Sequence, residues 1–332
     1  MLTIAVYLWI QAYSPFVYKE IGGKLKLFPD DYRYGDLYRL SYLPQFKNDA
    51  IECEHGHFTN KKPIQLFLIG DSFTEEPKIN LQDFPIESYQ YVHWAKHANY
   101  HLDTNRRNIL ILETVERTFK DHFSRVADNF FNQESVNEKT SFMQRIEKQV
   151  VKLGNIVSPK GTEDRLAHTL FNYDIFLSFR ELKASLNLNF FGRTEDEVVL
   201  SKDKTQVFYA DEADSINSKS AFYPIKDSEI DLFIQNINQT RNKYLNVGFD
   251  EVYLSIIPNK VSILAPDLGK YNHLIELIQG DKRLEMPIID TYSVFKKSPQ
   301  KYYLKSDTHW NCEGREAWLE KVNLILVQQN SK

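Results

Sequence analysis

Two short stretches, far apart in the chain, carry residue types that do nucleophilic chemistry. Ser72 comes soon after an apolar run, Leu66 to Ile69, with Gly70 between them. Asp307 and His309 lie two residues apart near the carboxyl end. A nucleophilic serine needs a base to remove its proton, and the base needs an acid to orient it. Together the two stretches predict a Ser72, His309 and Asp307 triad for acyl transfer.

The sequence around Ser72 predicts a strand that ends in a tight turn. Open α/β sheets bind their ligands at the carboxyl ends of their strands. Gly70 permits the turn, and Asp71 or Ser72 caps the helix expected next. A neighbouring backbone N–H is then available to an oxyanion, and Asp71 is a further candidate for substrate contact. Taken alone, this stretch also fits an ordinary capped turn, and the Asp307 stretch fits a structural loop with a hydrogen-bonded histidine.

These motifs resemble those of a known family. Gly70 to Phe73, with Asp307 to Trp310, is similar to the SGNH (GDSL-like) hydrolase superfamily. The Asp-Thr-His-Trp form more narrowly resembles its alginate O-acetyltransferase branch. Two further stretches lie at spacings that the family leads one to expect, Leu110 to Arg117 and Ser255 to Lys260. The resemblance covers roughly residues 35 to 327 and implies an SGNH-like three-layer α/β sandwich.

The resemblance also implies a function. The protein is expected to be an O-acetyltransferase that forms an acetyl-serine intermediate and acetylates a sugar hydroxyl of a cell-surface polysaccharide or exopolysaccharide, such as alginate. It is expected to receive acetyl from a membrane-bound O-acyltransferase and to work in the periplasm or at the cell surface. No metal or cofactor is implied. Two alternatives stay open: a carbohydrate acetylesterase, and a non-catalytic polysaccharide-binding relative that stacks sugars on Trp94 and Trp310.

Two features depart from the family pattern. The Asp-x-His motif follows the serine, as in ordinary SGNH hydrolases, whereas it precedes the serine in the alginate branch. The family's Gly-x-Asn-Asp block, whose asparagine helps to bind the oxyanion, is absent after the predicted strand 108–112. Arg117 either replaces that asparagine as a donor or pairs with Glu113 and Glu116.

A third predicted strand, 252–257, adds two candidate residues at its carboxyl end. Asn259 is a candidate oxyanion donor. Lys260 is a candidate for contact with an acidic sugar or for stabilising developing charge. Both residues also fit an ordinary turn.

Composition limits the class of protein. With 332 residues, 42% of them hydrophobic and 14% aromatic, the chain can bury a substantial core. A net charge of -4 gives no electrostatic footprint for nucleic acid. Cys53 and Cys312 are the two cysteines, and they form either a disulfide or two unrelated thiols.

The chain is expected to form one main domain after an N-terminal arm. Residues 1–34 are interpreted as an arm or the remnant of a signal-anchor, because Leu2 to Tyr18 carries no charge; a buried first helix is the alternative. Residues 35–332 are expected to form the catalytic domain, with an inserted α+β subregion at about 155–225.

Alternating strands and helices predict a mainly parallel sheet of about five strands, with helices on both faces. A short edge strand is expected at 288–290, and a hairpin at 198–209. Helices are expected at 87–98, 118–153, 230–245 and 315–327. The first of these would align His93, His97 and His101 on one face, as a zinc site or as ordinary helix surface.

Overall fold

The computed structural model describes residues 2–18, 29–30, 32–49, 51–131 and 160–328. The chain divides into two compact units. The first comprises Met1–Ala50 and Val136–Glu195, and the second comprises Ile51–Ser135 and Asp196–Lys332. The segment expected as a single insertion, 155–225, is thus divided between the units at Glu195. All three residues of the expected triad belong to the second unit.

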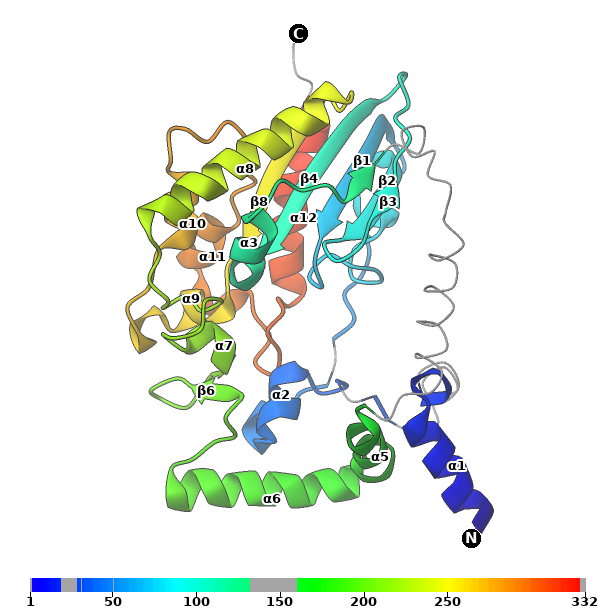
Figure 1. Cartoon of the computed structure of the whole chain (residues 1–332), viewed down its shortest axis with the longest axis vertical. Helices are drawn as coiled ribbons and strands as arrows, with labels where there is room; N and C mark the ends of the chain where they lie inside the picture. The colour runs from blue at the N-terminus through cyan, green and yellow to red at the C-terminus, as the bar shows by residue number, and fades with distance from the viewer. Residues whose placement is uncertain (1, 19–28, 31, 50, 132–159, 329–332) are drawn as a thin grey trace. The chain divides into compact units, whose positions relative to one another are not determined.

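The second unit is an α/β structure built on a four-stranded parallel sheet. The strand order is β2, β1, β4, β8, with bounds Ile86–His93, Lys62–Gly70, Arg107–Val115 and Glu251–Ile257 (Figure 1). The central strands β1 and β4 are runs of fully buried apolar residues, as expected for strands covered on both faces. An isolated parallel bridge from Leu254 to Ile288 occupies the place of the expected fifth strand. The prediction of a mainly parallel sheet is therefore confirmed.

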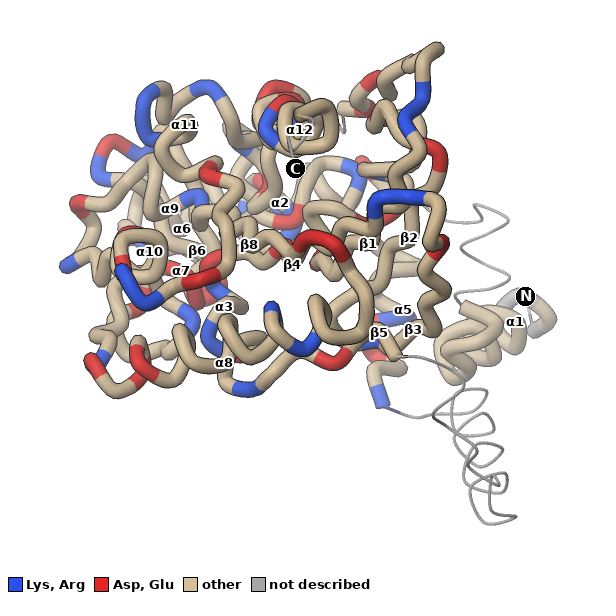
Figure 2. The backbone as a smooth tube through the Cα atoms, turned by 90° about the horizontal axis from the view of Figure 1, so that it is seen from above, with Lys and Arg blue, Asp and Glu red and all other residues tan. Residues whose placement is uncertain are grey.

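Helices cover both faces of this sheet. Figure 2 shows α3 and α8 on one face and α12 on the other. Their bounds are Glu116–Phe123, Asp227–Asn246 and Cys312–Val327. α8 buries an apolar stripe that includes Ile230, Phe233 and Ile237, and α12 buries Trp318, whose Nε1 donates to Ser255 Oγ of β8 at 2.9 Å. The helices predicted at 230–245 and 315–327 are confirmed.

One predicted helix is wrong. The stretch expected as a helix at 87–98 begins as β2, which pairs in parallel with β1. Its tyrosines and valine favour a strand. As an edge strand it is half-buried along most of its length, so its sequence lacks the clear alternation of apolar and polar residues by which a strand is predicted. The shared face expected for His93, His97 and His101 therefore does not form. His93 Nδ1 instead accepts a hydrogen bond from Ala95 N at 3.0 Å, and His97 pairs with Asp128.

Smaller elements complete the second unit. The predicted hairpin is confirmed as the antiparallel pair β6 and β7, Val198–Leu200 and Val207–Tyr209. A parallel pair, β3 and β5, joins Ala98–Asn99 to Phe130–Phe131. The short helices are α7, α9, α10 and α11, with bounds Ala210–Ala213, Lys260–Leu264, Leu274–Gln279 and Tyr292–Lys297. Among the described residues, 3₁₀ turns lie at Leu81–Asp83, Pro266–Leu268 and Pro299–Lys301 of this unit and at Pro44–Phe46 of the first unit.

The described part of the first unit is helical. Its α-helices are α1, α2, α5 and α6, with bounds Leu2–Tyr13, Asp36–Ser41, Thr162–Phe171 and Asp174–Phe191. No helix within the described ranges combines the length and apolar character that crossing a bilayer requires. Of the helix expected over 118–153, residues 118–123 belong to α3 of the second unit, residues 124–131 are not helical and end in β5, and 132–153 lies outside the described residues.

Two links, a disulfide and a buried ion pair, fasten the beginning of α12 to the chain that flanks β1. Cys53 and Cys312 form a disulfide that joins segments 259 residues apart. Three residues along from Cys312, the guanidinium of Arg315 donates to Asp83 Oδ1 at 2.5 Å and to the Lys78 carbonyl at 2.8 Å. The side chains of Asp83 and Arg315 are both almost wholly buried.

Asp83 is the centre of this second link. Its Oδ2 accepts from Asn80 N at 2.9 Å and from His55 Nδ1 at 3.0 Å. Burial opposes ionisation of Asp83, but these hydrogen bonds and the charge of Arg315 outweigh it and hold the pKa of the carboxyl below its ordinary value. His55 thus lies in an ion-pair network of the polar segment before β1.

We expect Asp83→Asn to lower the free energy of unfolding by about 3–5 kcal/mol near neutral pH, because Arg315 loses its buried partner and, among the described residues, keeps only the half-exposed Glu316 as an ionic one. Since the folded pKa is lowered, the carboxylate contributes fully above its unfolded pKa of about 3.9 and loses that contribution as the pH falls through the folded value. The difference in the free energy of unfolding between the variant and wild type therefore becomes smaller at acidic pH. Urea unfolding near pH 7 and near pH 3 measures both effects.

The matched control is Asp267→Asn, which breaks the exposed pair of Asp267 with Lys202. That variant should unfold like wild type, because exposed ion pairs contribute little. Equal destabilisation by the two substitutions would contradict the role given to Asp83.

Candidate active site

The turn after β1 presents Ser72 at the carboxyl edge of the sheet. Because β1 and β4 are adjacent, and the chain visits β2 on one side before β4 on the other, this edge is the topological switch point where open α/β sheets bind ligands. Gly70 is required there by close packing. A Cβ on Gly70 would overlap the Thr74 hydroxyl and come within 2.9 Å of Glu113 Oε2.

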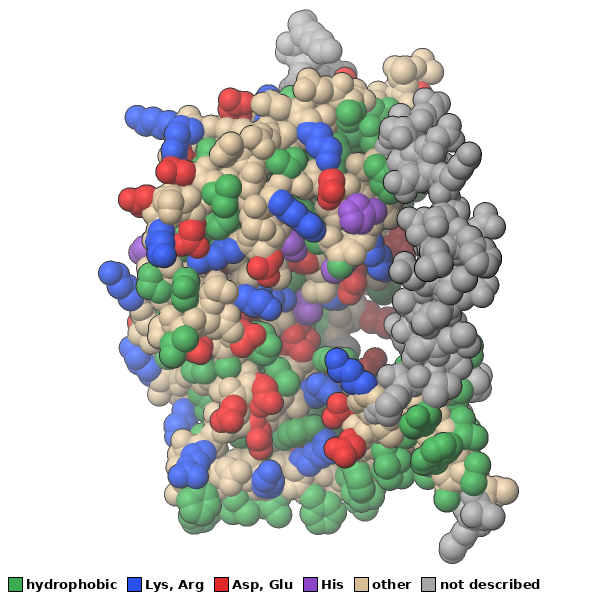
Figure 3. Space-filling model, viewed as in Figure 1, with side chains coloured by type: hydrophobic (Ala, Val, Ile, Leu, Met, Phe, Trp, Pro, Cys, Tyr) green, Lys and Arg blue, Asp and Glu red, His purple; other side chains and the backbone are tan. Residues whose placement is uncertain are grey.

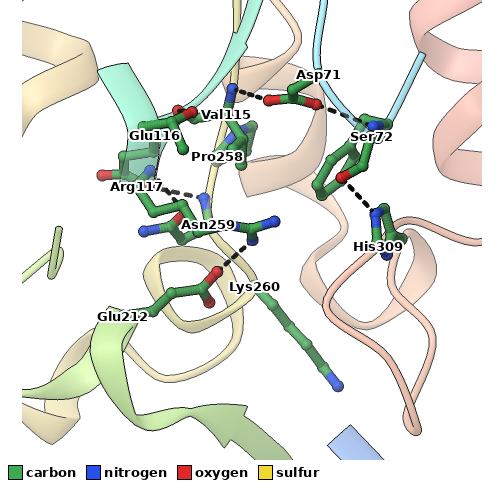
Figure 4. Close-up of polar contacts among 12 residues, drawn as sticks. Asp71, Ser72, Val115, Glu116, Arg117, Glu212, Pro258, Asn259, Lys260 and His309 are labelled. Carbon is green, nitrogen blue, oxygen red and sulfur yellow. Dashed lines mark hydrogen bonds and ion pairs between the residues drawn. The ribbon is translucent and has the colours of Figure 1, made fainter. Parts of the chain in front are cut away.

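The structure brings the three expected residues together. Ser72 Oγ lies 2.9 Å from His309 Nε2, across 237 residues of sequence (Figure 4). On the other side of the ring, His309 Nδ1 lies 2.5 Å from Asp307 Oδ1. With a carboxylate as its partner, Nδ1 carries the proton, which leaves the Nε2 lone pair to accept the serine O–H. The arrangement is that of nucleophile, base and orienting acid.

Packing fixes the orientation of the imidazole. Phe73, the residue after the serine, packs its ring 4.6 Å from the His309 ring, centroid to centroid. Trp310 meets the same phenylalanine edge-on at 5.2 Å. The Asp307 carboxylate also accepts the His309 backbone N–H at 2.9 Å, so it holds the ring and the backbone of the same residue. The His309 ring is therefore held in place by packing as well as by hydrogen bonds.

Lys260 supports the loop that carries His309. Its side chain is 1% exposed, and its Nζ donates to the backbone carbonyls of Lys305 at 2.9 Å and Asp307 at 3.3 Å. The ammonium thus provides a hydrogen-bond donor to two carbonyls of the loop. Lys260 was expected to face the substrate, and the contacts shown here are with the loop.

Asp71 ties the serine turn to the next strand. Its Oδ1 accepts from Phe73 N at 2.9 Å, and its Oδ2 accepts from Val115 N, at the end of β4, also at 2.9 Å. Asp71 was a candidate for substrate contact. With both oxygens bound to backbone amides, it instead holds the turn in register with β4.

Glu113 lies behind the same turn and was not singled out as a site residue. The side chain is fully buried, and its Oε2 accepts from Asp71 N at 3.0 Å and Thr74 Oγ1 at 2.8 Å. Burial raises the pKa of Glu113 well above its ordinary value, and the neighbouring Asp71 carboxylate adds to the shift. A carboxyl directly after a buried strand was the sequence signal that could have found it.

The two remaining candidates, Arg117 and Asn259, are joined to each other. Arg117 N donates to Asn259 Oδ1 at 3.0 Å, so the ends of β4 and β8 are linked. The Arg117 guanidinium forms an ion pair with buried Glu212 of α7 at 2.6 Å and lies 5.7 Å from the centroid of the Phe73 ring. The sequence had offered Glu113 and Glu116 as its partners; the partner shown is Glu212.

Asn259 and Glu116 form a buried polar cluster beside the site. Glu116 Oε2 accepts from Asn259 N at 2.9 Å and Ser262 Oγ at 2.6 Å. Burial raises the pKa of Glu116 to about 7, although these hydrogen bonds favour the charged form. Asn259 Nδ2 is buried with no recorded acceptor within the described part of the chain. It is therefore a donor held near the carboxyl edge of the sheet.

The comparisons identify no relative: the chain matches no protein-family model, no curated protein and no solved structure. What the site does must therefore be argued from its geometry.

We expect Lys260→Met to loosen the loop at 304–310. The variant keeps the length of the side chain but removes the charged donor of two loop carbonyls, a loss of about 1.5–3 kcal/mol. Amide hydrogen exchange in this loop should accelerate by about tenfold or more, measured by mass spectrometry on the folded protein.

Lys305→Met is the control, because the Lys305 side chain is exposed and only its backbone carbonyl takes part. It should exchange like wild type. Unchanged exchange in Lys260→Met would mean that the lysine does not hold the loop.

Proposed function

We propose that the protein is a serine acyltransferase of the SGNH type, which carries an acetyl group on Ser72. One observation carries the proposal: the continuous hydrogen-bonded chain from Ser72 Oγ through His309 to Asp307. A structural loop has no need of a histidine aimed at a serine on a neighbouring strand end. The mainly parallel sheet, with helices on both faces, supports the finer assignment to an SGNH-like three-layer sandwich.

In the proposed reaction, His309 Nε2 takes the proton from Ser72 Oγ, and the oxygen attacks the acetyl carbonyl of the donor. The tetrahedral intermediate collapses as the imidazolium returns its proton to the leaving group, which leaves acetyl-Ser72. An acceptor hydroxyl then gives its proton to His309 and attacks the acetyl-serine. Collapse of the second intermediate returns the proton to Ser72 and releases the acetylated acceptor. Asp307 stabilises the imidazolium in both halves.

The negative charge of each intermediate needs donors. The Ser72 backbone N–H has no acceptor recorded among the described residues and lies beside the reacting oxygen. Arg117 and Asn259, at the ends of β4 and β8, are the proposed sources of a second donor in place of the family's asparagine. Each donor of this kind contributes about 2.7–4 kcal/mol of transition-state stabilisation.

The proposed acceptor is a sugar hydroxyl of a cell-surface polysaccharide or exopolysaccharide, and the proposed donor is a membrane-bound O-acyltransferase. Both rest on the resemblance to the alginate O-acetyltransferase branch. The Cys53–Cys312 disulfide supports a location outside the cytoplasm, because structural disulfides persist in oxidising compartments.

Ser72→Ala should lower turnover of an activated acetyl ester by about three orders of magnitude or more, because the triad acts as a unit. Initial rates with 4-nitrophenyl acetate measure the loss. Mass spectrometry of the wild-type protein should detect acetyl on the peptide that contains Ser72. An unchanged circular dichroism spectrum would show that the variant folds.

Ser293→Ala removes an exposed hydroxyl elsewhere in the second unit and should keep wild-type turnover. Near wild-type activity in Ser72→Ala would remove this serine from the mechanism. If acetyl-Ser72 is detected, adding oligosaccharide to the acetylated protein distinguishes transfer of the acetyl group to sugar from its hydrolysis. Acetylated sugar identifies a transferase, and acetate alone identifies an esterase.

A further inference from the structure

Helix α6 is apolar on two opposite sides. It has 18 residues, and one side packs inward through Leu177, Ala184 and Leu188. A helix that is hydrophobic all round normally has all its sides covered. Here the first unit covers one side only.

The opposite side of α6 presents a stripe of large apolar side chains to solvent. The spacing of four, three, four and four residues places them in one row along the helix. Their exposed fractions are 67% for Ile175, 67% for Phe179, 58% for Leu182, 44% for Leu186 and 76% for Phe190. Figure 3 shows hydrophobic side chains gathered along this outer side of α6. We call this row the α6 stripe.

Two exposed basic residues lie near the α6 stripe. Lys183 is 71% exposed beside the stripe and forms an exposed pair with Glu195, at 3.7 Å between Nζ and Oε1, and exposed Arg193 follows the end of the helix. Exposed pairs of this kind contribute little, so Lys183 is able to exchange Glu195 for another anion. The acidic groups of α6 are engaged within the first unit: Asp174 pairs with Arg33, and Glu181 pairs with Lys47. An anionic surface therefore meets basic residues beside the stripe.

A second apolar helix belongs to the same unit. α1 has no charged residue, packs against α5 and exposes Tyr7, Trp9 and Ile10. Arg165 of α5 donates to the Ala12 carbonyl of α1 at 2.5 Å, and only two residues separate α5 from α6. Aromatic side chains such as those of Trp9 and Tyr7 favour the interface between water and lipid.

We propose that the first unit binds the surface of an anionic lipid bilayer, with α6 lying in the plane of the interface and its stripe turned to the acyl chains. The middle of α6 carries three charged residues, Arg180, Glu181 and Lys183, so the helix is not apolar enough to enter lipid on all sides. Its inner side is packed on the rest of the unit. Only the stripe is therefore expected to enter lipid. A protein partner would need hydrogen-bonding groups across the patch, about one per 100–200 Å² of interface. Within the stripe's span Ser178 bonds back to its own helix, at the Asp174 carbonyl, and exposed Asn189 lies beside the stripe near its end.

Vesicle binding by the full chain tests the proposal. Leu182→Gln with Leu186→Gln places two polar amides in the stripe without changing charge. We expect wild type to co-sediment with vesicles of phosphatidylcholine and phosphatidylglycerol, and the double variant to bind at least tenfold more weakly. Binding of wild type should fall in vesicles of phosphatidylcholine alone and at high salt, because Lys183 and Arg193 lose their anionic partners.

The matched control is Leu232→Gln with Leu324→Gln. These leucines are 43% and 58% exposed on α8 and α12 of the second unit, so the change in composition is the same but lies away from the stripe. This variant should bind vesicles like wild type. Circular dichroism of all three proteins checks that each is folded.

Trp9 provides a second readout. It is 60% exposed, whereas Trp94, Trp310 and Trp318 are buried. Vesicles with brominated acyl chains should therefore quench the fluorescence of Trp9 in wild type. The emission of the three buried tryptophans should remain largely unquenched.

Three results would overturn the proposal. They are a wild type that stays in the supernatant with anionic vesicles, stripe and control variants that bind equally, and a dimer in solution that the stripe variant alone converts to monomer. The last would assign the stripe to a second copy of the chain. None of these results bears on the chemistry of Ser72, because the inference is independent of the proposed function.

Discussion

The parallel register of β1 with β4 is the constraint on which the site depends. Adjacent parallel strands end at the same edge, so the residues that follow them meet whatever their separation in sequence. Here the ends are also tied to each other, because Asp71 beyond β1 accepts the backbone N–H of Val115 on β4. The serine turn is therefore held to the sheet by the Asp71 side chain, which accepts from a backbone amide of β4, as well as by the strand that leads into it.

His309 reaches this edge from the other end of the chain. Its loop is held from beneath by the buried amine of Lys260, at the end of β8. Behind it, α12 is fastened by the Cys53–Cys312 disulfide and by the buried Arg315–Asp83 pair. Each fastening joins the carboxyl-terminal part to the chain near β1 or β8. Removing one partner of a buried pair is costly, so these links make the meeting of Ser72 and His309 a property of the folded unit.

Buried carboxyls concentrate at the end of β4. Glu113 and Glu116 are both buried there, and burial raises the pKa of each. Their hydrogen bonds go to the serine turn in one case and to the segment after β8 in the other. Shifted carboxyls often mark functional sites. At this site their contacts indicate that they organise the loops around the serine.

The sequence alone determined the local events. Apolar runs predicted β1, β4 and β8, helical spacing predicted α8 and α12, and residue type and spacing singled out Ser72, Asp307 and His309. These features depend on residues that are close in the sequence, so the local sequence pattern is sufficient to predict them. The tertiary structure decided the rest. β2 is a strand because it pairs with β1, Arg117 pairs with Glu212 from a segment 95 residues away, and Lys260 turns to a loop 45 residues further along. Such partners depend on which segments the fold brings together, and no local pattern records that.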